Sequence, residues 1–293
     1  MTGAIARSGC PHAILCADDY GLSTGVSEAI RELANQERLS ATSAIVTLDR
    51  WPPDAQGLRA VRDRIAIGLH INLTLGAPLG LMPSLASDGR LPALGSLIVR
   101  ALSRRIDRDE IAAEVARQLA RFESVFGFAP DHIDGHQHVH ALPGVRDGVL
   151  AALTARFPDG GPLVRNPVDS PSRIWRHSSA VSKALMIGLL SSGFGSAVRA
   201  RGFAINTGFS GVSSFDRRKP YTVELDRSLS LPSRRHLIMC HPGHVDAALS
   251  RIDPIVARRE DEYDAIARHA GLPSLLWRPA RPKDGPPVDW ERD

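Results

Sequence analysis

The chain has 293 residues, of which 43% are hydrophobic and 23% charged, a composition that indicates a folded globular protein and excludes the disordered and fibrous classes. The formal net charge is +4, but the basic residues are scattered and only 5% of residues are aromatic, so we expect no nucleic-acid partner. The longest apolar stretch, residues 184–190, is far shorter than the roughly 20 residues of a membrane span. No apolar segment typical of a signal peptide follows the first charged residues, so we expect a cytoplasmic protein.

Short apolar runs alternate along the chain with longer segments of helical periodicity. The runs that predict strands are residues 13–17, 43–48, 65–72, 132–136, 163–165, 203–207, 236–240 and 274–277. Helices are predicted over residues 25–38, 109–126, 144–156, 179–201 and 254–269. Ser23 or Thr24 can cap the first helix, and Gly127 can end the second.

This alternation of strands and helices predicts an α/β protein with a parallel sheet and crossover helices. Seven or eight such units indicate a TIM-like (β/α) barrel, regular or irregular, as a single domain over residues 1–293. We expect a core of about residues 12–278 and a loosely ordered tail over residues 279–293, which are rich in proline and charge. The loop of residues 75–94 follows a predicted strand, where barrel loops usually build the substrate site.

Polar side chains stand at the carboxyl ends of five predicted strands. They are the pair Asp18 and Asp19, then His70, then His136 and His138, then Arg165, and finally His241. In a barrel these strand ends converge on one face, so residues far apart in sequence can share a cleft. Taken singly, paired acids can cap a helix and a histidine can be a buried structural residue. Taken together, carboxylates and imidazoles without a thiolate favour a site for one divalent ion such as Zn²⁺, Mg²⁺, Mn²⁺ or Fe²⁺.

Four motifs resemble those of the YdjC-like carbohydrate deacetylases, a group that includes chitooligosaccharide and hopanoid-biosynthesis deacetylases. The motifs are CADDYG at residues 16–21, GLHINLT at 68–74, HIDGHQHVH at 132–140 and CHPG at 240–243. They occur in the family's order, with Tyr20 where phenylalanine is commonest and Gly135 where serine is frequent. The resemblance implies a (β/α) barrel, one divalent metal (Zn or Mg) bound by an aspartate and two histidines, and removal of an N-acetyl group from an amino sugar.

The resemblance also implies roles for individual residues. The metal ligands would be Asp19, His70 and His136, the general base Asp18 and the general acid His241. Such a set suits amide hydrolysis, because a metal lowers the pKa of its bound water and polarises the carbonyl group. A carboxylate can then take the proton of the water, and a histidine can protonate the departing amine.

Three further residues belong to the expected site. His138 competes with His136 for the third ligand position, because both would point the same way on a strand. Otherwise His138 and Asn72 are expected to bind the substrate. Arg165 lies in an Arg-Asn-Pro sequence similar to the Arg-x-Pro element of the related polysaccharide deacetylases, and would orient Asp18 as a catalytic residue.

Two other interpretations compete with an N-deacetylase. The first is another metal-dependent hydrolase, such as a phosphoesterase, which would need two metals and a bridging carboxylate. The second is a sugar- or metal-binding protein without turnover. The sequence leaves open whether the substrate is chitobiose, a longer chitooligosaccharide, an N-acetylglucosaminyl lipid or another glycoconjugate. A homodimer is a further expectation.

Overall fold

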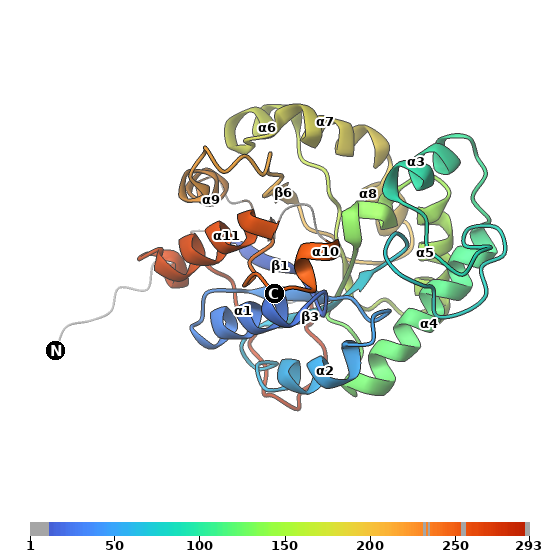
Figure 1. Ribbon diagram of the computed structural model, residues 1–293, viewed down its shortest axis with the longest axis horizontal. Coiled ribbons are helices and arrows are strands. Elements are labelled where there is room, and N and C mark those ends of the chain that lie inside the picture. Colours follow the sequence, from blue (N-terminus) through green and yellow to red (C-terminus); the bar gives the residue numbers. More distant parts are fainter. Residues whose placement is uncertain (1–11, 231–232, 234, 253–255, 291–293) are drawn as a thin grey trace.

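The computed structural model describes residues 12–230, 233, 235–252 and 256–290, and its strands form a single parallel sheet (Figure 1). Within the described residues the sheet has seven strands in the order β5-β4-β3-β2-β1-β7-β6. Their bounds are β1 Ile14–Tyr20, β2 Ala41–Ala44, β3 Ala66–Ile71, β4 His132–Gly135, β5 Leu163–Val164, β6 Gly208–Ser210 and β7 His236–Cys240. All neighbouring pairs are parallel, as the alternation of strands and helices predicts.

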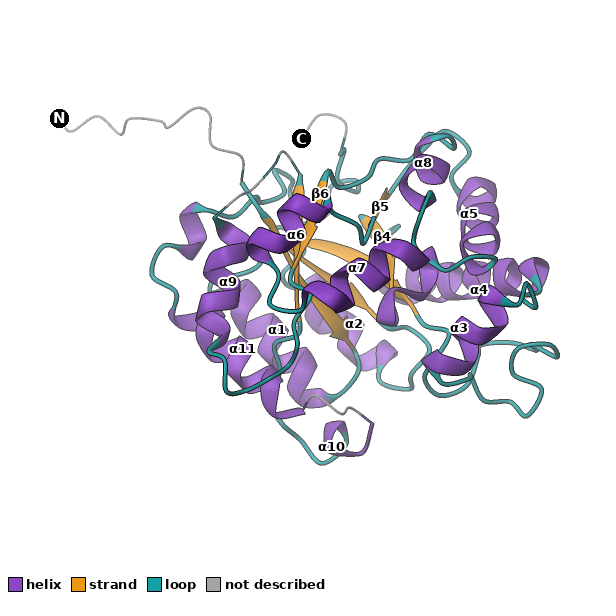
Figure 2. Ribbon diagram, turned by 90° about the horizontal axis from the view of Figure 1, so that it is seen from above, coloured by secondary structure: helices purple, strands orange, loops and turns teal. Residues whose placement is uncertain are grey.

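The helices surround the sheet (Figure 2). They are α1 Thr24–Asn35, α2 Trp51–Arg59, α3 Leu94–Leu102, α4 Arg108–Phe126, α5 Val145–Arg156, α6 Pro171–His177, α7 Val181–Leu190, α8 Phe194–Arg199, α9 Tyr221–Leu229, α10 Leu249–Ile252 and α11 Val256–Arg268, with 3-10 turns η1 His136–Ala141 and η2 Leu272–Ser274. The predicted caps are confirmed, since Ser23 caps α1 and Gly127 ends α4 with a left-handed φ of 88°. None of the described helices combines the length and apolarity that crossing a bilayer requires.

The sheet curls until its two edges nearly meet, which gives an irregular TIM-like barrel. Val164 of β5 forms a parallel bridge with Ile205, and three residues later the same segment becomes β6 beside β7. The side chain of Asn206 secures this junction, because its amide nitrogen donates to the carbonyl oxygens of Asn166 and Gly208 at 2.9 and 3.0 Å. The predicted strand over residues 203–207 is therefore reduced to one bridge, and the regular pairing starts at Gly208.

Strand residues are buried on both faces, which explains their continuous apolar runs. Leu15, Ile67 and Ile238 face the surrounding helices and belong to the larger hydrophobic cluster. Ile14 and Leu237 face the barrel interior and belong to a smaller one. The core of the barrel therefore has an outer layer shared with the helices and a narrow inner layer below the strand ends.

Other elements differ from the sequence-based expectations. The predicted helix 179–201 is two helices, α7 and α8, separated by a turn in which Gly193 has a φ of 76°. The predicted strand 274–277 contributes only the bridge between Leu276 and Ala13. The short helices α2, α3, α6, α9 and α10 were not predicted. Residues 254 and 255 of the predicted last helix lie outside the described residues.

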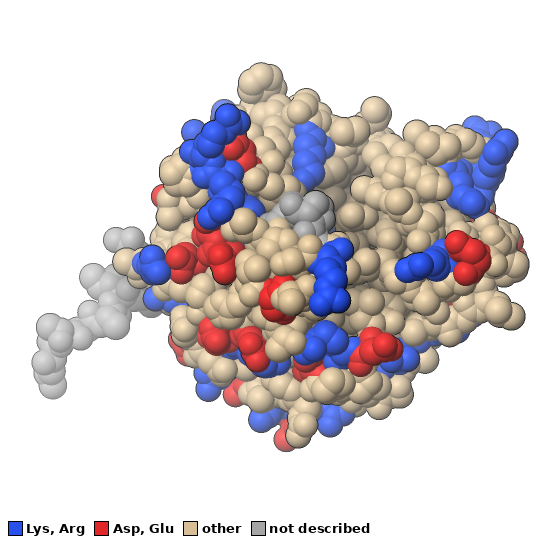
Figure 3. Space-filling model, in the orientation of Figure 1, with Lys and Arg blue, Asp and Glu red and all other residues tan. Residues whose placement is uncertain are grey.

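The surface view agrees with the scattered charge of the sequence. On the face drawn in Figure 3, basic and acidic side chains are interspersed and form no continuous basic tract.

The tail was expected to be loosely ordered, but its described part packs tightly against the amino-terminal ends of the strands. Arg281 forms an ion pair with Asp131, a residue only 2% exposed that directly precedes β4. The backbone N–H of Val288 donates to the same carboxylate at 2.9 Å. The indole of Trp290 is buried, donates to the Asp131 carbonyl and stacks on Trp277 with 4.8 Å between ring centroids.

This packing predicts that the tail contributes to stability. Arg281→Ala removes the cationic partner of the buried Asp131 carboxylate, so the free energy of unfolding should fall by roughly 3 kcal/mol. Arg268→Ala, which removes an exposed ion pair with Asp264, is the matched control and should cost less than about 0.5 kcal/mol. Urea denaturation monitored by circular dichroism measures both values. If both variants lower the free energy of unfolding by the same small amount, the tail is loosely ordered, as the sequence analysis expects.

Candidate active site

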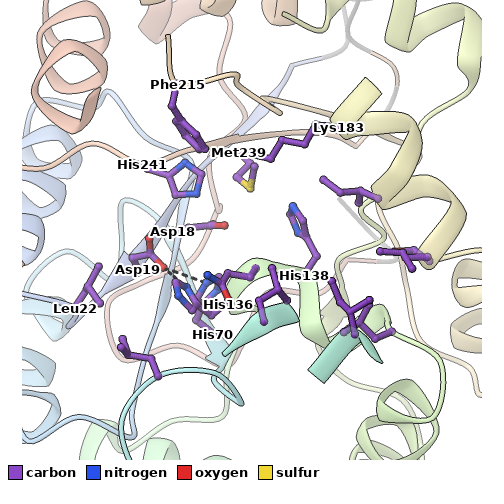
Figure 4. A pocket seen from close by; sticks show the side chains of 18 of the residues that line it. Asp18, Asp19, Leu22, His70, His136, His138, Lys183, Phe215, Met239 and His241 are labelled. Atoms are coloured by element: carbon purple, nitrogen blue, oxygen red, sulfur yellow. Dashed lines mark hydrogen bonds and ion pairs between the residues drawn. The ribbon is translucent and has the colours of Figure 1, made fainter. Parts of the chain in front are cut away.

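The carboxyl ends of the strands open into a pocket of about 350 Å³. Its floor carries the polar residues predicted from the sequence, whereas its walls are largely apolar. The polar lining includes Asp18, Asp19, His70, His136, His138 and His241 (Figure 4). Part of the apolar wall comes from α3 and α7. The structure therefore brings the predicted residues of four strands to one cavity.

The paired acids owe their positions to an irregularity in β1. Between Ala17 and Tyr20 the pairing with β2 gains one extra residue, which is a β-bulge. Asp19 also has a φ of 70°, a left-handed conformation that is uncommon for a residue with a side chain. Both aspartates therefore lie within β1, which extends to Tyr20, beyond the predicted strand of residues 13–17. Because of the bulge, the two carboxylates point in different directions: Asp18 contacts Arg165, and Asp19 contacts Arg259 and His136.

Asp19, His70 and His136 form a compact cluster of possible metal ligands. The Asp19 Oδ1 atom lies 2.8 Å from His136 Nδ1 and 3.3 Å from His70 Nε2. The three ligand atoms lie within 4.8 Å of one another, so a single ion could contact all of them. Arg259 of α11 donates to the other Asp19 oxygen at 2.6 Å. This contact leaves Oδ1 as the carboxylate oxygen that faces the histidines.

Asp134 fixes the orientation of the His70 ring. Its Oδ1 atom lies 2.6 Å from His70 Nδ1, so Nε2 is turned toward Asp19. Carboxylates in this position are typical partners of metal-binding histidines. Burial by itself would lower the pKa of His70, but the carboxylates of Asp134, Asp19 and Asp18 together outweigh it and raise the pKa to about 10. Without an ion, His70 is therefore a cation between two carboxylates.

The guanidinium group of Arg165 lies between two aspartates beneath the pocket. It donates two hydrogen bonds of 2.6 Å to Asp18, one to each oxygen, and its Nη2 atom lies 2.5 Å from Asp134 Oδ2. Arg165 is fully buried, and His140 Nε2 lies 2.8 Å from its carbonyl oxygen. Ser43 adds a 3.3 Å hydrogen bond to Asp18 Oδ1. Asp18 is thus held by side chains from two strands, Arg165 at the end of β5 and Ser43 of β2.

His241 lies at the end of β7 on the wall above the two aspartates (Figure 4). Its ring is edge-on to Phe215, with 5.8 Å between ring centroids. The His241 backbone N–H donates to the carboxylate of Glu262 at 2.5 Å. Burial lowers the pKa of His241 to about 4, against the attraction of Asp19 and Asp18. The imidazole is therefore neutral at pH 7.

The histidines of the 132–140 block have separate positions. His136 is the first residue of η1, but Gln137 and His138 have φ values of 54° and 61°, so the strand does not continue through them. His138 therefore lines another part of the pocket. The cluster of possible metal ligands includes His136 and not His138. His132 lies inside the barrel, where Gly68 leaves room for its ring, since a Cβ atom there would lie 2.4 Å away.

Asn72, which the sequence analysis expects to bind the substrate, is not among the residues that line the described pocket. Its amide nitrogen donates to Thr47 Oγ1 and to the Leu75 carbonyl, each at 2.7 Å. Its amide oxygen accepts the N–H groups of Thr74 and Leu75 at 3.1 and 3.0 Å. The side chain therefore shapes the turn after β3.

Sequence reasoning did not single out Asp134, Arg259 and Lys183. Asp134 belongs to the motif of residues 132–140 and lies near the end of β4, so its place in the motif could have identified it. Arg259 lies on α11, 240 residues from its partner Asp19, and Lys183 lies on α7. Nothing local in the sequence separates either of them from other helix residues.

Comparisons with known proteins agree with this geometry. A model of the family described as YdjC-like protein matches residues 12–270. The chitooligosaccharide deacetylase of Klebsiella pneumoniae (strain 342) is 32% identical over 237 residues, which cover 80% of this chain and 83% of that protein. The chitooligosaccharide deacetylase of Citrobacter koseri is 33% identical over 235 residues, covering 80% and 82% of the two chains.

The fold is also similar to a crystal structure from Enterococcus faecalis V583, of a protein whose suggested activity is cellobiose-phosphate cleavage. The TM-score is 0.68 and the sequence identity 20%, and the match covers 92% of this chain and 98% of that one. At this identity the likeness concerns the fold alone. The family match and the sequence relatives extend over most of the chain, and the chain therefore belongs to the YdjC-like family.

Proposed function

We propose that this protein is a metal-dependent hydrolase that removes the N-acetyl group from an amino sugar or from an oligosaccharide or glycoconjugate that contains N-acetylglucosamine. The observation that carries the proposal is the cluster of Asp19, His70 and His136 beside an aspartate, Asp18, that Arg165 holds in place. The names of the curated relatives support the same reaction, since they are chitooligosaccharide deacetylases.

The residues present fit one divalent ion. Two imidazole nitrogens and one carboxylate oxygen are the mixture that Zn²⁺ accepts in catalytic sites, where three protein ligands leave a position for water. A bound ion would lower the pKa of that water and polarise the amide carbonyl. His70 and Asp134 already have the arrangement of a ligand and its supporting carboxylate.

Asp18 is the proposed general base. Its two oxygens accept hydrogen bonds from Arg165, one from each terminal nitrogen, which fixes the plane of the carboxylate. A carboxylate held in this way can receive the proton of an attacking water without first reorganising. Arg165 is too deeply buried to touch a substrate in the pocket, so its role is to orient Asp18.

His241 is the proposed general acid for the departing amine. Because its imidazole is neutral at pH 7, it must gain a proton during the reaction before it can donate one. The proton taken from the attacking water by Asp18 is the source at hand, since Asp18 and His241 line the same pocket. Asp18 and His241 would then act in sequence on one proton.

The two competing functions lose support from the same contacts. A two-metal phosphoesterase needs further ligands next to the first ion, but Asp18 and Asp134 are both bound to the guanidinium of Arg165. Among the described residues two other candidate clusters exist, Asp18 with His70 and Asp134, and Cys16 with His132 and Asp134. Arg165 contacts the carboxylates of the first and lies 3.2 Å from the sulfur of the second. A binding protein without turnover would have no need of an oriented base.

An acetate-release assay tests the proposed function. The purified protein, reconstituted with Zn²⁺ or Mg²⁺, should release acetate from N-acetylglucosamine or a chitooligosaccharide, and a chelator followed by dialysis should abolish the release. Restoring the ion should restore the activity. Acetate release that is unaffected by complete metal removal would refute metal dependence, and no release from any N-acetylated sugar would refute the deacetylase.

The two neighbouring aspartates should behave differently when changed to asparagine. Asp18→Asn should retain the metal but lose roughly 10²–10⁴ in kcat, because the base is lost. Asp19→Asn should weaken metal binding, and excess ion should partly restore its activity. Metal titration by calorimetry together with acetate release distinguishes the two, and Asp109→Asn on the exposed start of α4 is the matched control. Loss of the metal from Asp18→Asn alone would reverse the assignment.

A further inference from the structure

Two helices beside the mouth of the pocket carry large apolar side chains that are exposed to solvent. On α3, Val99 and Leu102 are 64% and 61% exposed. On α7, Met186 and Leu189 are 57% and 77% exposed, and Leu185 is partly exposed as well. We call these five residues the apolar rim. Single exposed apolar side chains are ordinary, but a group of them on neighbouring elements indicates an interaction surface.

The apolar rim continues the inner wall of the pocket. On α3, Ile98 lines the pocket and Leu102 follows it one helical turn later. On α7, Met186 belongs to both surfaces, since it lines the pocket and is more than half exposed, and Leu189 lies three residues further on. The apolar surface therefore runs without interruption from inside the pocket to the outside of the molecule.

The segments that carry the rim contain basic residues but no acidic ones. Residues 89–106, which include α3, have four arginines, and residues 170–215, which include α6 to α8, have four arginines and one lysine. The other 27 basic residues share the rest of the chain with all 32 acidic residues. In Figure 3 the described side chains over α7 and between α7 and α3 are tan or blue, with none in red. The surroundings of the rim are therefore positively charged.

We propose that the apolar rim and the arginines around it dock on a membrane surface that contains anionic lipids. The apolar side chains would enter the boundary between headgroups and acyl chains, and the basic residues would attract the lipid phosphates. Trp175, which is 72% exposed on a helix that packs against α7, is of a residue type enriched at that depth. The mouth of the pocket would then face the lipid headgroups. This docking goes beyond the proposed function, because the metal cluster and His241 take no part in it.

The charges favour a lipid surface over the other possible occupants. A second copy of the chain docked on the same face would bring two positively charged surfaces together, which is unfavourable. A nucleic acid would match the charge, but single-stranded nucleic acids stack their bases on aromatic side chains, whereas the rim is aliphatic. An anionic membrane surface matches both the apolar centre and the basic surroundings.

Co-sedimentation of the full chain with lipid vesicles tests the docking. One set of vesicles contains phosphatidylcholine alone, and the other contains phosphatidylcholine mixed with phosphatidylglycerol. The protein should bind the mixed vesicles at least about tenfold more tightly, and added salt should weaken this binding. Equal binding to the two sets, or binding to neither, would overturn the proposal.

The double variant Leu102→Gln with Leu189→Gln removes apolar surface from both helices with a residue that suits a helix. Neither leucine lines the pocket. The variant should bind the mixed vesicles at least about tenfold more weakly than the wild type does. Leu275→Gln is the matched control, since Leu275 is 43% exposed and lies beside Ala13, just before β1 and at the opposite end of the barrel.

If the rim variant and the control bind the vesicles equally well, the apolar rim is not the docking surface. Leu189→Gln alone, at the most exposed position of the rim, takes the place of the double variant should circular dichroism show that the latter does not fold. It should again weaken vesicle binding relative to Leu275→Gln.

Two further measurements identify the other occupants. A wild-type dimer that the rim variant dissociates in sedimentation velocity, together with no vesicle binding, would assign the face to a second copy. A labelled oligonucleotide that displaces the protein from vesicles would assign it to a nucleic acid. Either result would overturn the proposal.

Vesicle binding needs neither a metal nor turnover, so its outcome is separate from that of the acetate-release assay. An active deacetylase that ignores the mixed vesicles would refute the docking alone. A protein that binds them through the rim but releases no acetate would refute the deacetylase alone.

Discussion

The buried guanidinium group of Arg165 is the contact on which the rest of the site depends. It binds both oxygens of Asp18 and one oxygen of Asp134, and each of these three residues is at most 2% exposed. Burying two carboxylates without a cation would be strongly destabilising. Asp134 in turn orients His70, so one arginine connects the proposed base to a proposed metal ligand.

Backbone strain is concentrated at the same place. Asp19, Gln137 and His138 have φ values of 70°, 54° and 61°, and all three line the pocket. Conformations of this kind cost of order 1–3 kcal/mol each and persist when surrounding contacts enforce them. For Asp19 those contacts are Arg259 and His136, at 2.6 and 2.8 Å. The strained backbone separates the directions of Asp18 and Asp19, and it turns His138 away from the ligand cluster.

Much of the fold and the composition of the site could be predicted, because their signals are local. β3 and β7 are mainly apolar, with His70 near the end of β3 and His241 directly after β7, and α1 and α4 have caps next to apolar stripes. The helix α2 was missed because Pro52 and Pro53 suggest a turn, although prolines also suit a first helical turn. The tail was misjudged because its anchor, Asp131, lies 150 residues from Arg281.

The finer geometry of the site depended on contacts that no local pattern contains. Strand periodicity placed His138 beside His136, but the chain leaves the strand at His136. Asn72 occupies a motif position, yet its side-chain amide is used in hydrogen bonds with Thr47 and with the backbone of the loop after β3. Arg259 and Lys183 reach the pocket from helices whose packing is set by the whole barrel. Residue types at strand ends were therefore predictable, whereas the directions of side chains were not.

The most direct test of this account is the steady-state kinetics of Arg165→Lys on an N-acetylated sugar. Lysine keeps the positive charge between Asp18 and Asp134 but cannot form the two parallel hydrogen bonds of a guanidinium group. The account predicts that kcat falls by about 10²-fold or more, as for loss of an oriented base, while KM and metal content stay near the wild-type values. A rise in KM with kcat unchanged would contradict it, because Arg165 would then serve substrate binding.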